Sequence, residues 1–437
     1  MRNCRRGALT ATALSFAVAG FASSAQAESL MDAIALAYQT NPQVLTQRSI
    51  VRQADELYYR TQRAIGPAIT ADVSLGATAI NDFDPSCSFS GTICSERFST
   101  TDTTSAALNI TQPIYSGGRL TANIKAQEAA VLAARENLRD VEARVLLQVV
   151  ADYVEVNRAT EAVAIAEANV VVLTRQQQEA QTRFEVGAST RTDVAQAQSR
   201  LATAQTSLIQ ARAALANAQA NYGRDVGQPP GKLDKEPDIS SLVPKDAALA
   251  FDVAQDNNPT LRAAYLRERQ SAQNVAAARS AYRPTVTGTV TAGYVPDIFG
   301  QDQDRTVVAG VRASVPLYTG LTTASTIRTA IEANNQDKIG IENQRRTLLQ
   351  QIATSFNNLV SAQSSIASNQ TAVDASNLAQ MGTREEQQVG LRTTLDVLNA
   401  EQEYRAAQLN LVNARANAYT ATVTLLNAMG KLDVGVF

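Results

Sequence analysis

Hydrophobic and polar positions alternate with two different periods along this chain. Four short stretches switch regularly between apolar and polar residues, which is typical of a β-strand with one apolar and one wet face. We therefore predict strands at about 68–80, 104–115, 284–295 and 305–318, of which the second is the least regular. A half-buried surface hairpin has this pattern, and so does a strand that crosses a lipid bilayer at a tilt.

Other stretches have a period of seven. In two return helices, predicted at 190–222 and 392–428, larger apolar residues recur every seven positions and alanine fills a second position of each heptad. Small side chains at such a seam allow neighbouring backbones to approach closely. A soluble antiparallel coiled coil has the same seam, so the seam alone does not distinguish a soluble protein from a membrane protein.

The predicted helices differ greatly in length. Two long helices are expected at 119–186 and 322–388, and at 1.5 Å per residue each extends for roughly 100 Å. Each return helix covers only about half of that distance. A further helix fills the remaining half if it stacks on the end of the return helix, at about 42–64 in one half of the chain and 259–282 in the other. Each chain then has four tall helical columns that lead towards four strands.

The two halves of the chain are copies of one unit. Asn41-Pro42 recurs as Asn258-Pro259 at an offset of 217 residues, whereas Pro113–Gly117 recurs as Pro316–Gly320 at an offset of 203. The difference falls in a loop between the strands, which is longer in the first copy. The chain therefore divides into repeat 1 at 28–227, a proline-rich linker at 228–244 and repeat 2 at 245–437.

The N-terminus has the features of a secretory signal peptide at 1–27. Arginines precede a short apolar run from Ala8 to Phe21, and Ala25-Gln26-Ala27 fits a cleavage site. Export to an oxidising compartment favours a disulfide between Cys87 and Cys94, which lie in the longer loop of repeat 1.

Composition argues against several classes of function. The 437 residues carry a net charge of −2, which does not suit a nucleic-acid partner, and they include no histidine. We therefore expect no metal site, no cofactor and no enzymatic activity, because the usual acid–base and nucleophile sets are missing. After the signal peptide no stretch is long and apolar enough for a transmembrane helix, so insertion into a membrane has to use the strands. Four strands do not close a barrel, and several chains must then share one.

The tandem repeat and two motifs resemble the TolC family of outer-membrane efflux proteins over essentially the whole mature chain. The motifs are Arg183–Val194 and Gln388–Leu398, and each has a Val-Gly turn followed by Asp-Val at an equivalent helical position. The resemblance implies an α+β protein of the Gram-negative outer membrane, in which three chains form a twelve-stranded β-barrel in outer-membrane lipid. It also implies that this barrel continues as a long α-helical, coiled-coil barrel through the periplasm.

The same resemblance implies partners. A member of this family docks with a periplasmic adaptor (membrane fusion) protein and with an inner-membrane ABC-type or proton-driven transporter. The exposed tips that contact the adaptor are expected to be Val186, Gly187, Ala188, Val389, Gly390 and Leu391. Local chemistry by itself explains both glycines as helix C-caps. As cargo, drug efflux and type I protein secretion both remain open.

A gate at the entrance of the tunnel is implied as well. By motif match, Arg392 falls on the arginine that links neighbouring helix tips, Asp193 on the aspartate that it engages, and Asp396 on the first aspartate of the entrance ring. Two residues depart from the family pattern, since Gln387 replaces a linking tyrosine and Asn399 a second ring aspartate. We therefore expect a looser closed state and a less negative entrance. The structural alternative for the linking pair is an ordinary solvated ion pair, worth about 0–1 kcal/mol.

The main alternative to a duct subunit is a periplasmic coiled-coil adaptor protein. Such an adaptor also has a signal peptide and long helical hairpins, so these two features do not separate the two classes. Membrane fractionation separates them, because a duct subunit stays in the outer membrane and an adaptor does not.

Overall fold

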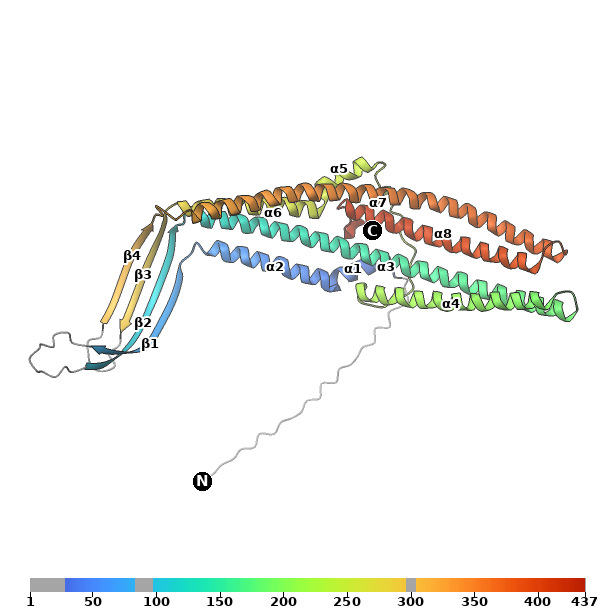
Figure 1. Ribbon diagram of the computed structural model, residues 1–437, viewed down its shortest axis with the longest axis horizontal. Helices are drawn as coiled ribbons and strands as arrows, with labels where there is room; N and C mark the ends of the chain where they lie inside the picture. The colour runs from blue at the N-terminus through green and yellow to red at the C-terminus, as the bar shows by residue number, and fades with distance from the viewer. Residues whose placement is uncertain (1–27, 83–96, 296–303, 437) are drawn as a thin grey trace, which may run out of the picture.

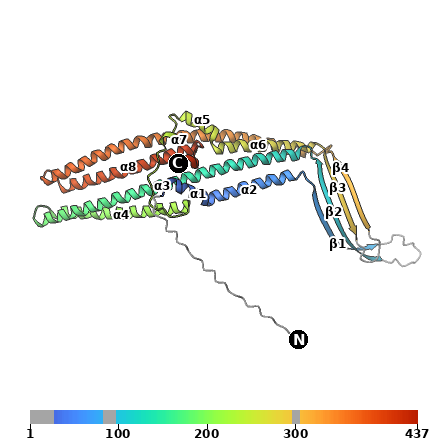
Figure 2. The same cartoon turned by 180° about the vertical axis from the view of Figure 1, so that it is seen from behind.

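The computed structural model describes residues 28–82, 97–295 and 304–436, and the structural statements below concern these residues. The molecule is elongated, with the strands at one end, the helical turns at the opposite end and the C-terminus near the middle (Figures 1 and 2). Cys87 and Cys94 lie outside the described residues, so their disulfide stays a prediction, and so does the signal peptide.

The sheet is an antiparallel meander of four strands in the order β1-β2-β3-β4. The strands are β1 (Ala68–Asp82), β2 (Arg97–Tyr115), β3 (Thr285–Val295) and β4 (Asp304–Ser314). β2 begins before the expected residue 104 because it follows β1 out to the pair of Asp82 and Arg97. β4 ends at Ser314 and not at 318, because Ser314 pairs with the first residue of β3 and no further residue of β3 remains.

Two helices of 67 residues, α3 (Arg119–Glu185) and α7 (Thr322–Gln388), run from the sheet to the far end of the molecule. Each turns back into a shorter return helix, α4 (Arg191–Val226, 36 residues) or α8 (Thr394–Ala428, 35 residues). The remaining height is filled by α2 (Pro42–Arg63), which packs against α3, and by α6 (Pro259–Arg279), which lies between α3 and α7 (Figure 1).

A buried asparagine joins the stacked helices in both repeats. Asn41 caps α2, because its Oδ1 accepts a hydrogen bond from the backbone N–H of Gln43 at 2.9 Å. Its Nδ2 donates to the carbonyl oxygen of Asp225, near the end of α4, at 3.1 Å. Asn258 joins α6 to α8 in the same way, with Nδ2 3.0 Å from the carbonyl oxygen of Ala428. Each asparagine thus satisfies polar groups at two helix ends, which explains why Asn-Pro recurs in the sequence.

The middle of the molecule is thickened by shorter elements that the sequence pattern does not distinguish from the columns. They are α1 (Leu30–Thr40), α5 (Ala247–Asn257) and single 3₁₀ turns at Ser240–Leu242, Ser280–Tyr282 and Val434–Val436. The larger hydrophobic core lies here, where α1, α3 and α4 meet, and a second core joins α5, α6, α7 and α8. A tandem repeat of long helices with one small sheet confirms the α+β fold class. None of the described helices combines the length and the apolar character needed to cross a membrane.

Candidate functional site at the helical tips

Both helical hairpins end in the same tight turn. In the first, the N–H of Gly187 donates to the carbonyl oxygen of Phe184 at 3.0 Å, and the N–H of Ala188 donates to that of Arg183 at 2.8 Å. This pair of bonds is the Schellman arrangement, which needs a left-handed residue after the helix. Gly187 supplies it with φ +78°, and Gly390 of the second hairpin has φ +81° with the same two bonds at 3.0 and 2.9 Å.

The two turns present apolar side chains to solvent. Val186 is 75% exposed, Val389 71% and Leu391 75%, and Ala188 is exposed as well. A Cβ added to Gly187 would meet no atom within 4 Å, so backbone conformation and not crowding selects glycine there. The structure therefore gathers the expected tip residues at one end of the molecule, where their side chains are exposed.

The two aspartates at the tips begin the return helices. Asp193 accepts hydrogen bonds from the backbone N–H and the hydroxyl of Thr190, at 2.9 and 2.8 Å, while its own N–H donates to the Thr190 hydroxyl at 3.2 Å. Asp396 makes the same capping box with Thr393. The hydrogen bonds from the threonines hold the pKa of both carboxyl groups below its ordinary value, so both stay ionised at neutral pH. Sequence reasoning had missed this structural role, although Thr-x-x-Asp before a helix is its signal.

Arg392 pairs within its own hairpin. Its Nε lies 2.7 Å from Oε2 of Glu386, and this hydrogen bond raises the pKa of the guanidinium further. Gln387 donates from Nε2 to Oγ1 of Thr394 at 3.3 Å, on the neighbouring helix of the same hairpin. No ion pair joins Arg392 to Asp193 within the part of one chain that the structure describes. The structure thus places both residues at the tips without bringing them together inside one protomer.

Asn399, which replaces the second ring aspartate of the family pattern, has a cationic partner. Arg200 reaches from α4 to α8 and donates from Nη2 to Oδ1 of Asn399 at 2.9 Å, and its Nη1 contacts Oε1 of Gln402. Arg200 is a tip-region residue that sequence reasoning missed, since it lies beside the apolar heptad seam and outside both tip motifs. The contact connects the two hairpins of one protomer.

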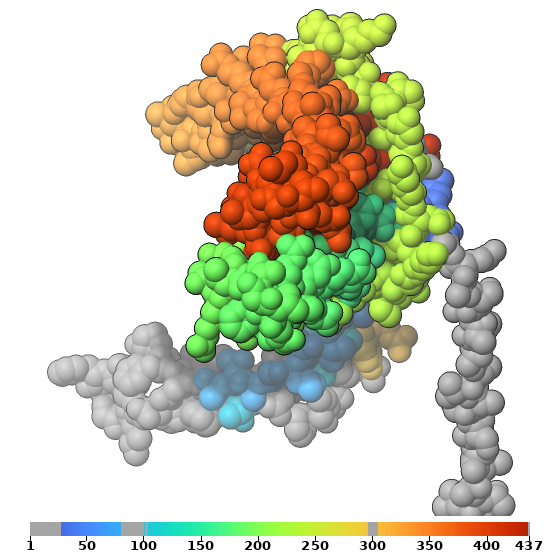
Figure 3. Space-filling view, turned by 90° about the vertical axis from the view of Figure 1, so that its right-hand side faces the viewer, coloured from blue at the N-terminus to red at the C-terminus, as the bar shows by residue number. Residues whose placement is uncertain are grey.

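Beneath this polar contact the hairpins share a small apolar cluster. Leu398 of α8 is 1% exposed and packs against Ala197 and Ala204 of α4 and Leu173 and Ala180 of α3. Figure 3 looks at the tips along the molecule and shows the two hairpin ends side by side. The alanines of the heptad seam therefore admit a leucine from the other repeat, and this fixes the distance between the tips.

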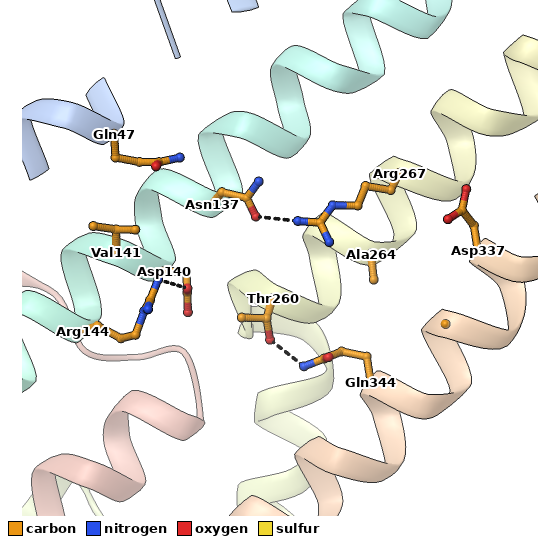
Figure 4. A pocket seen from close by; sticks show the side chains of 11 residues that line it. Gln47, Asn137, Asp140, Val141, Arg144, Thr260, Ala264, Arg267, Asp337 and Gln344 are labelled. Atoms are coloured by element: carbon orange, nitrogen blue, oxygen red, sulfur yellow. Dashed lines mark hydrogen bonds and ion pairs between the residues drawn. The ribbon is translucent and has the colours of Figure 1, made fainter. Parts of the chain in front are cut away.

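Further from the tips, the helices α2, α3, α6 and α7 lie side by side and line a hollow of about 560 Å³. Its lining is mostly polar or charged (Figure 4), and the residues include Gln47, Asn137, Asp140, Arg144, Arg267 and Asp337. Arg267 donates to Oδ1 of Asn137 at 3.2 Å, and Arg144 pairs with Asp140 at 2.9 Å. The helices therefore present polar side chains to water at this hollow.

A family model described as outer membrane efflux protein matches residues 33–222 and 250–431, which fall within repeats 1 and 2. The chain belongs to the outer membrane efflux protein family. Outer membrane efflux protein BepC of Brucella suis biovar 1 is 33% identical over 413 residues, which cover 94% of this chain and 87% of BepC. Outer membrane protein TolC of Escherichia coli K12 is 24% identical over 444 residues, which cover 96% of this chain and 86% of TolC.

A solved structure shows the same fold. The Campylobacter jejuni CmeC outer membrane channel has a TM-score of 0.79 and 15% identity, and the match covers 93% of this chain and 87% of CmeC. The resemblance to the TolC family is thereby confirmed, and the chain is an outer-membrane efflux protein of the α+β tunnel fold with its helical columns in the periplasm. This family consists of channels, so the alternative of a periplasmic adaptor is set aside.

Proposed function

We propose that three copies of this chain form a passive duct, which conducts cargo from an inner-membrane pump through the periplasm and the outer membrane. The observation that carries the proposal is that this chain combines an open β-sheet with long helical columns. A sheet with two unpaired edges lies at one end of the molecule, and helical columns that reach the opposite end continue from it (Figure 1).

The two faces of the sheet support a barrel wall in lipid. One face is apolar and open to the surroundings, with Ile69 63%, Leu75 79% and Val307 76% exposed. The other face is polar, and there Asn109 donates to Asp72 at 2.7 Å and accepts from the Thr291 hydroxyl at 2.8 Å. Within the described chain β1 and β4 each pair on one side only. Backbone groups in lipid must be paired, so β4 of one copy pairs with β1 of the next until the ring closes.

The polar hollow between the columns supports an aqueous passage. The ion pair Arg144–Asp140 and the hydrogen bond from Arg267 to Asn137 line it. A polar lining without a specific binding site discriminates poorly between cargo molecules, and we therefore assign cargo selection to the pump. The chain itself then needs neither enzymatic activity nor a cofactor.

The tips fit a periplasmic adaptor as partner. Val186, Val389 and Leu391 are the most exposed apolar side chains of the turns, and rigid Schellman turns hold them at the very end of the molecule. Apolar residues on a rigid, exposed end are suited to burial against another protein. A pump of the ABC or proton-driven type then completes the path across the inner membrane.

The charged tip residues fit a gate that closes between protomers. Asp193 and Arg392 do not meet inside one chain, but both lie at the tips and both are ionised. In a ring, Arg392 of one copy can exchange its partner Glu386 for Asp193 of its neighbour. Each link at a wet entrance is worth about 0–1 kcal/mol, and three act together on the balance between closed and open states. Arg200, bound to Asn399, makes the entrance less negative than two rings of aspartate would.

The proposal is tested by the mass and location of the protein in its native membrane. We expect the chain to remain in the outer-membrane fraction after salt and alkaline washes, and to have the mass of three copies in mild detergent by light scattering. A monodisperse single chain, or release into the soluble periplasmic fraction, would contradict the duct and favour an adaptor.

A further inference from the structure

The internal repeat fixes how one copy meets the next, residue by residue. Resting on the proposed ring of three chains, we infer that β4 of one protomer pairs with β1 of its partner in the register that β2 keeps with β3. At the base of this interface, Leu321 of one copy packs over Gly66 of a second copy. The occupant of the exposed edge is therefore a second copy of this chain, in one stated register.

The strands of the two repeats are equivalent at the level of single pairs. Ala68 of β1 lies opposite Thr111 of β2, and Thr285 of β3 lies opposite Ser314 of β4. The first residues of these pairs are 217 positions apart, and the second are 203 apart. These are the offsets of the sequence repeat, so the β1–β2 and β3–β4 hairpins superpose without a register shift.

The contact between repeats inside one chain then serves as a template. β2 pairs with β3 so that Asn109 lies opposite Thr291 and Ile110 opposite Val290. Adding 203 to a β2 residue and subtracting 217 from a β3 residue gives its counterpart at the other edge. Arg312 is thereby placed opposite the partner's Ser74, and Ala313 opposite the partner's Val73.

The base of the template interface is crowded. A Cβ on Gly117 would come within 2.8 Å of the Arg283 Cβ, and one on Gly118 within 3.3 Å of the Arg283 guanidinium. Arg283 also donates from Nη1 to the carbonyl oxygen of Gly117 at 3.2 Å. Here a large side chain of repeat 2 fills the space over two glycines of repeat 1.

At the interface between copies, the large and the small residues exchange places between the two repeats. The counterparts of Gly117 and Gly118 are Gly320 and Leu321, and the counterpart of Arg283 is Gly66. A Cβ on Gly320 would meet nothing within 4 Å in the single chain. Leu321 on one copy therefore supplies the bulk that Gly66 of the partner lacks.

The conformation of Leu321 fits this assignment. It is the one residue other than glycine with positive φ among those described, at +66°, and its side chain is 72% exposed. A left-handed leucine is strained, and the described residues of its own chain leave most of its side chain uncovered. A neighbouring copy that covers the side chain explains why leucine persists where repeat 1 has glycine.

Disulfide cross-linking tests the register. In a background with Cys87→Ser and Cys94→Ser, we expect the pairs Ser74→Cys with Arg312→Cys and Val73→Cys with Ala313→Cys to join neighbouring chains. Hydrogen-bonded and non-hydrogen-bonded pairs alternate, so one of the two has the closer Cα separation of about 4.5 Å. The matched control, Ser74→Cys with Val308→Cys, lies on the same face four residues along, and should not cross-link. Cross-linking of the control in place of both expected pairs would overturn the register.

A size exchange tests the contact at the base. Gly66→Arg should lower the fraction of detergent-resistant trimer by about tenfold, because two large side chains then compete for one space. Gly66→Ala is the control for the backbone, since its Cβ meets only the Arg63 carbonyl oxygen at 3.2 Å. Adding Leu321→Gly to Gly66→Arg recreates the arrangement inside the chain and should restore most of the trimer.

The two inferences fail separately. If the double variant is no better than Gly66→Arg alone while the unaltered protein forms trimers, the contact between Leu321 and Gly66 is wrong and the duct stands. If the unaltered protein forms no oligomer in detergent or membranes, the proposed function itself is wrong.

Discussion

The two repeats form equivalent packing regions in the middle of the molecule, and repeat 1 uses tyrosines where repeat 2 uses apolar side chains. In repeat 1 the buried rings of Tyr153 and Tyr222 lie 6.5 Å apart. The positions 203 residues later in repeat 2 hold Phe356 and Leu425, and Leu425 is fully buried as well. Both versions surround the same asparagine cap between stacked helices. The backbone arrangement thus depends on side-chain volume and on the cap, and not on the hydroxyl groups.

The hydroxyl groups of Tyr153 and Tyr222 attach two other chain segments to repeat 1. Tyr222 donates to Oε1 of Glu28 at 2.6 Å, and the Tyr153 hydroxyl lies 2.9 Å from the carbonyl oxygens of Glu28 and Asp234. These partners belong to the segment just before α1 and to the linker, which also form a parallel bridge at Glu28 and Leu233. At the corresponding place repeat 2 is closed by α5 and aliphatic side chains, so it needs no buried donors.

A pair of carboxyl groups is a further polar feature that repeat 1 has and repeat 2 lacks. Asp152 and Asp225 face each other in repeat 1, where repeat 2 has Ser355 and Ala428. Asp152 is 7% exposed, and its burial, together with the neighbouring carboxylate, raises its pKa to about 7. Asp225 pairs with Arg224 at 2.7 Å, and this keeps the pKa of Asp225 below its ordinary value. Repeat 1 therefore contains a buried group that titrates near neutral pH.

The largest effect should come from removing the buried ring that only repeat 1 has. Tyr222→Ala should lower the free energy of unfolding by about 3–5 kcal/mol, because it leaves a cavity and removes the donor to Glu28. Tyr222→Phe isolates the hydroxyl and should cost about 1.5–3 kcal/mol, since the lost bond is to a charged group. The midpoint of thermal unfolding measures both. A Tyr222→Phe variant as stable as the parent would show that the hydroxyl group is dispensable.

The carboxyl pair should make stability depend on pH. The folded pKa of Asp152 lies above its ordinary value, so the folded state binds more protons between about pH 4 and pH 7. Its contribution is fully present below that window and is lost as the pH rises through about 7, by at most about 1.4 kcal/mol per pH unit. Asp152→Asn should flatten the dependence of the unfolding midpoint between pH 5 and pH 8. Asp225 acts oppositely and only in strong acid, because its pKa is lowered. An unchanged pH profile in Asp152→Asn would contradict the assignment.

The tips of the two repeats, in contrast, should respond alike to loss of a cap. Thr190→Ala and Thr393→Ala each remove the side-chain half of a capping box, and each should cost about 1 kcal/mol. Hydrogen exchange of the first turns of α4 and α8 measures the effect locally. A loss confined to one repeat would show that the two turns are not equivalent.

Removing the charge of Asp193 and removing that of Asp396 should have different effects on conduction. Asp193→Asn keeps an acceptor for the cap but removes the charge, so it should raise conductance, as Arg392→Ser should. Each link is weak, about 0–1 kcal/mol, and should weaken further in salt. Asp396→Asn should reduce cation selectivity without raising conductance. Thr190→Ala is the matched control, because it weakens the cap and leaves the Asp193 charge. Equal conductance in Asp193→Asn, Arg392→Ser and the parent would remove the gate assignment.

Periodicity in the sequence predicted the columns and strands, because long helices and alternating strands repeat one local rule many times. The Asn-Pro pair was visible too, but its link to the end of another helix depends on tertiary stacking. The contact of Arg200 could not be predicted, since its partners Asn399 and Gln402 lie about two hundred residues away in the chain. The capping role of Asp193 was readable in Ser189-Thr190-x-x-Asp193, and the expected gate obscured it. The strain at Leu321 shows only in the backbone.

Single-channel recording in planar bilayers tests the duct most directly. Purified oligomer added to one side should insert and give discrete conductance steps, and their size should increase when Arg392→Ser loosens the tips. Protein that has the mass of three chains but produces no ion current, in the parent and in Arg392→Ser alike, would contradict the account.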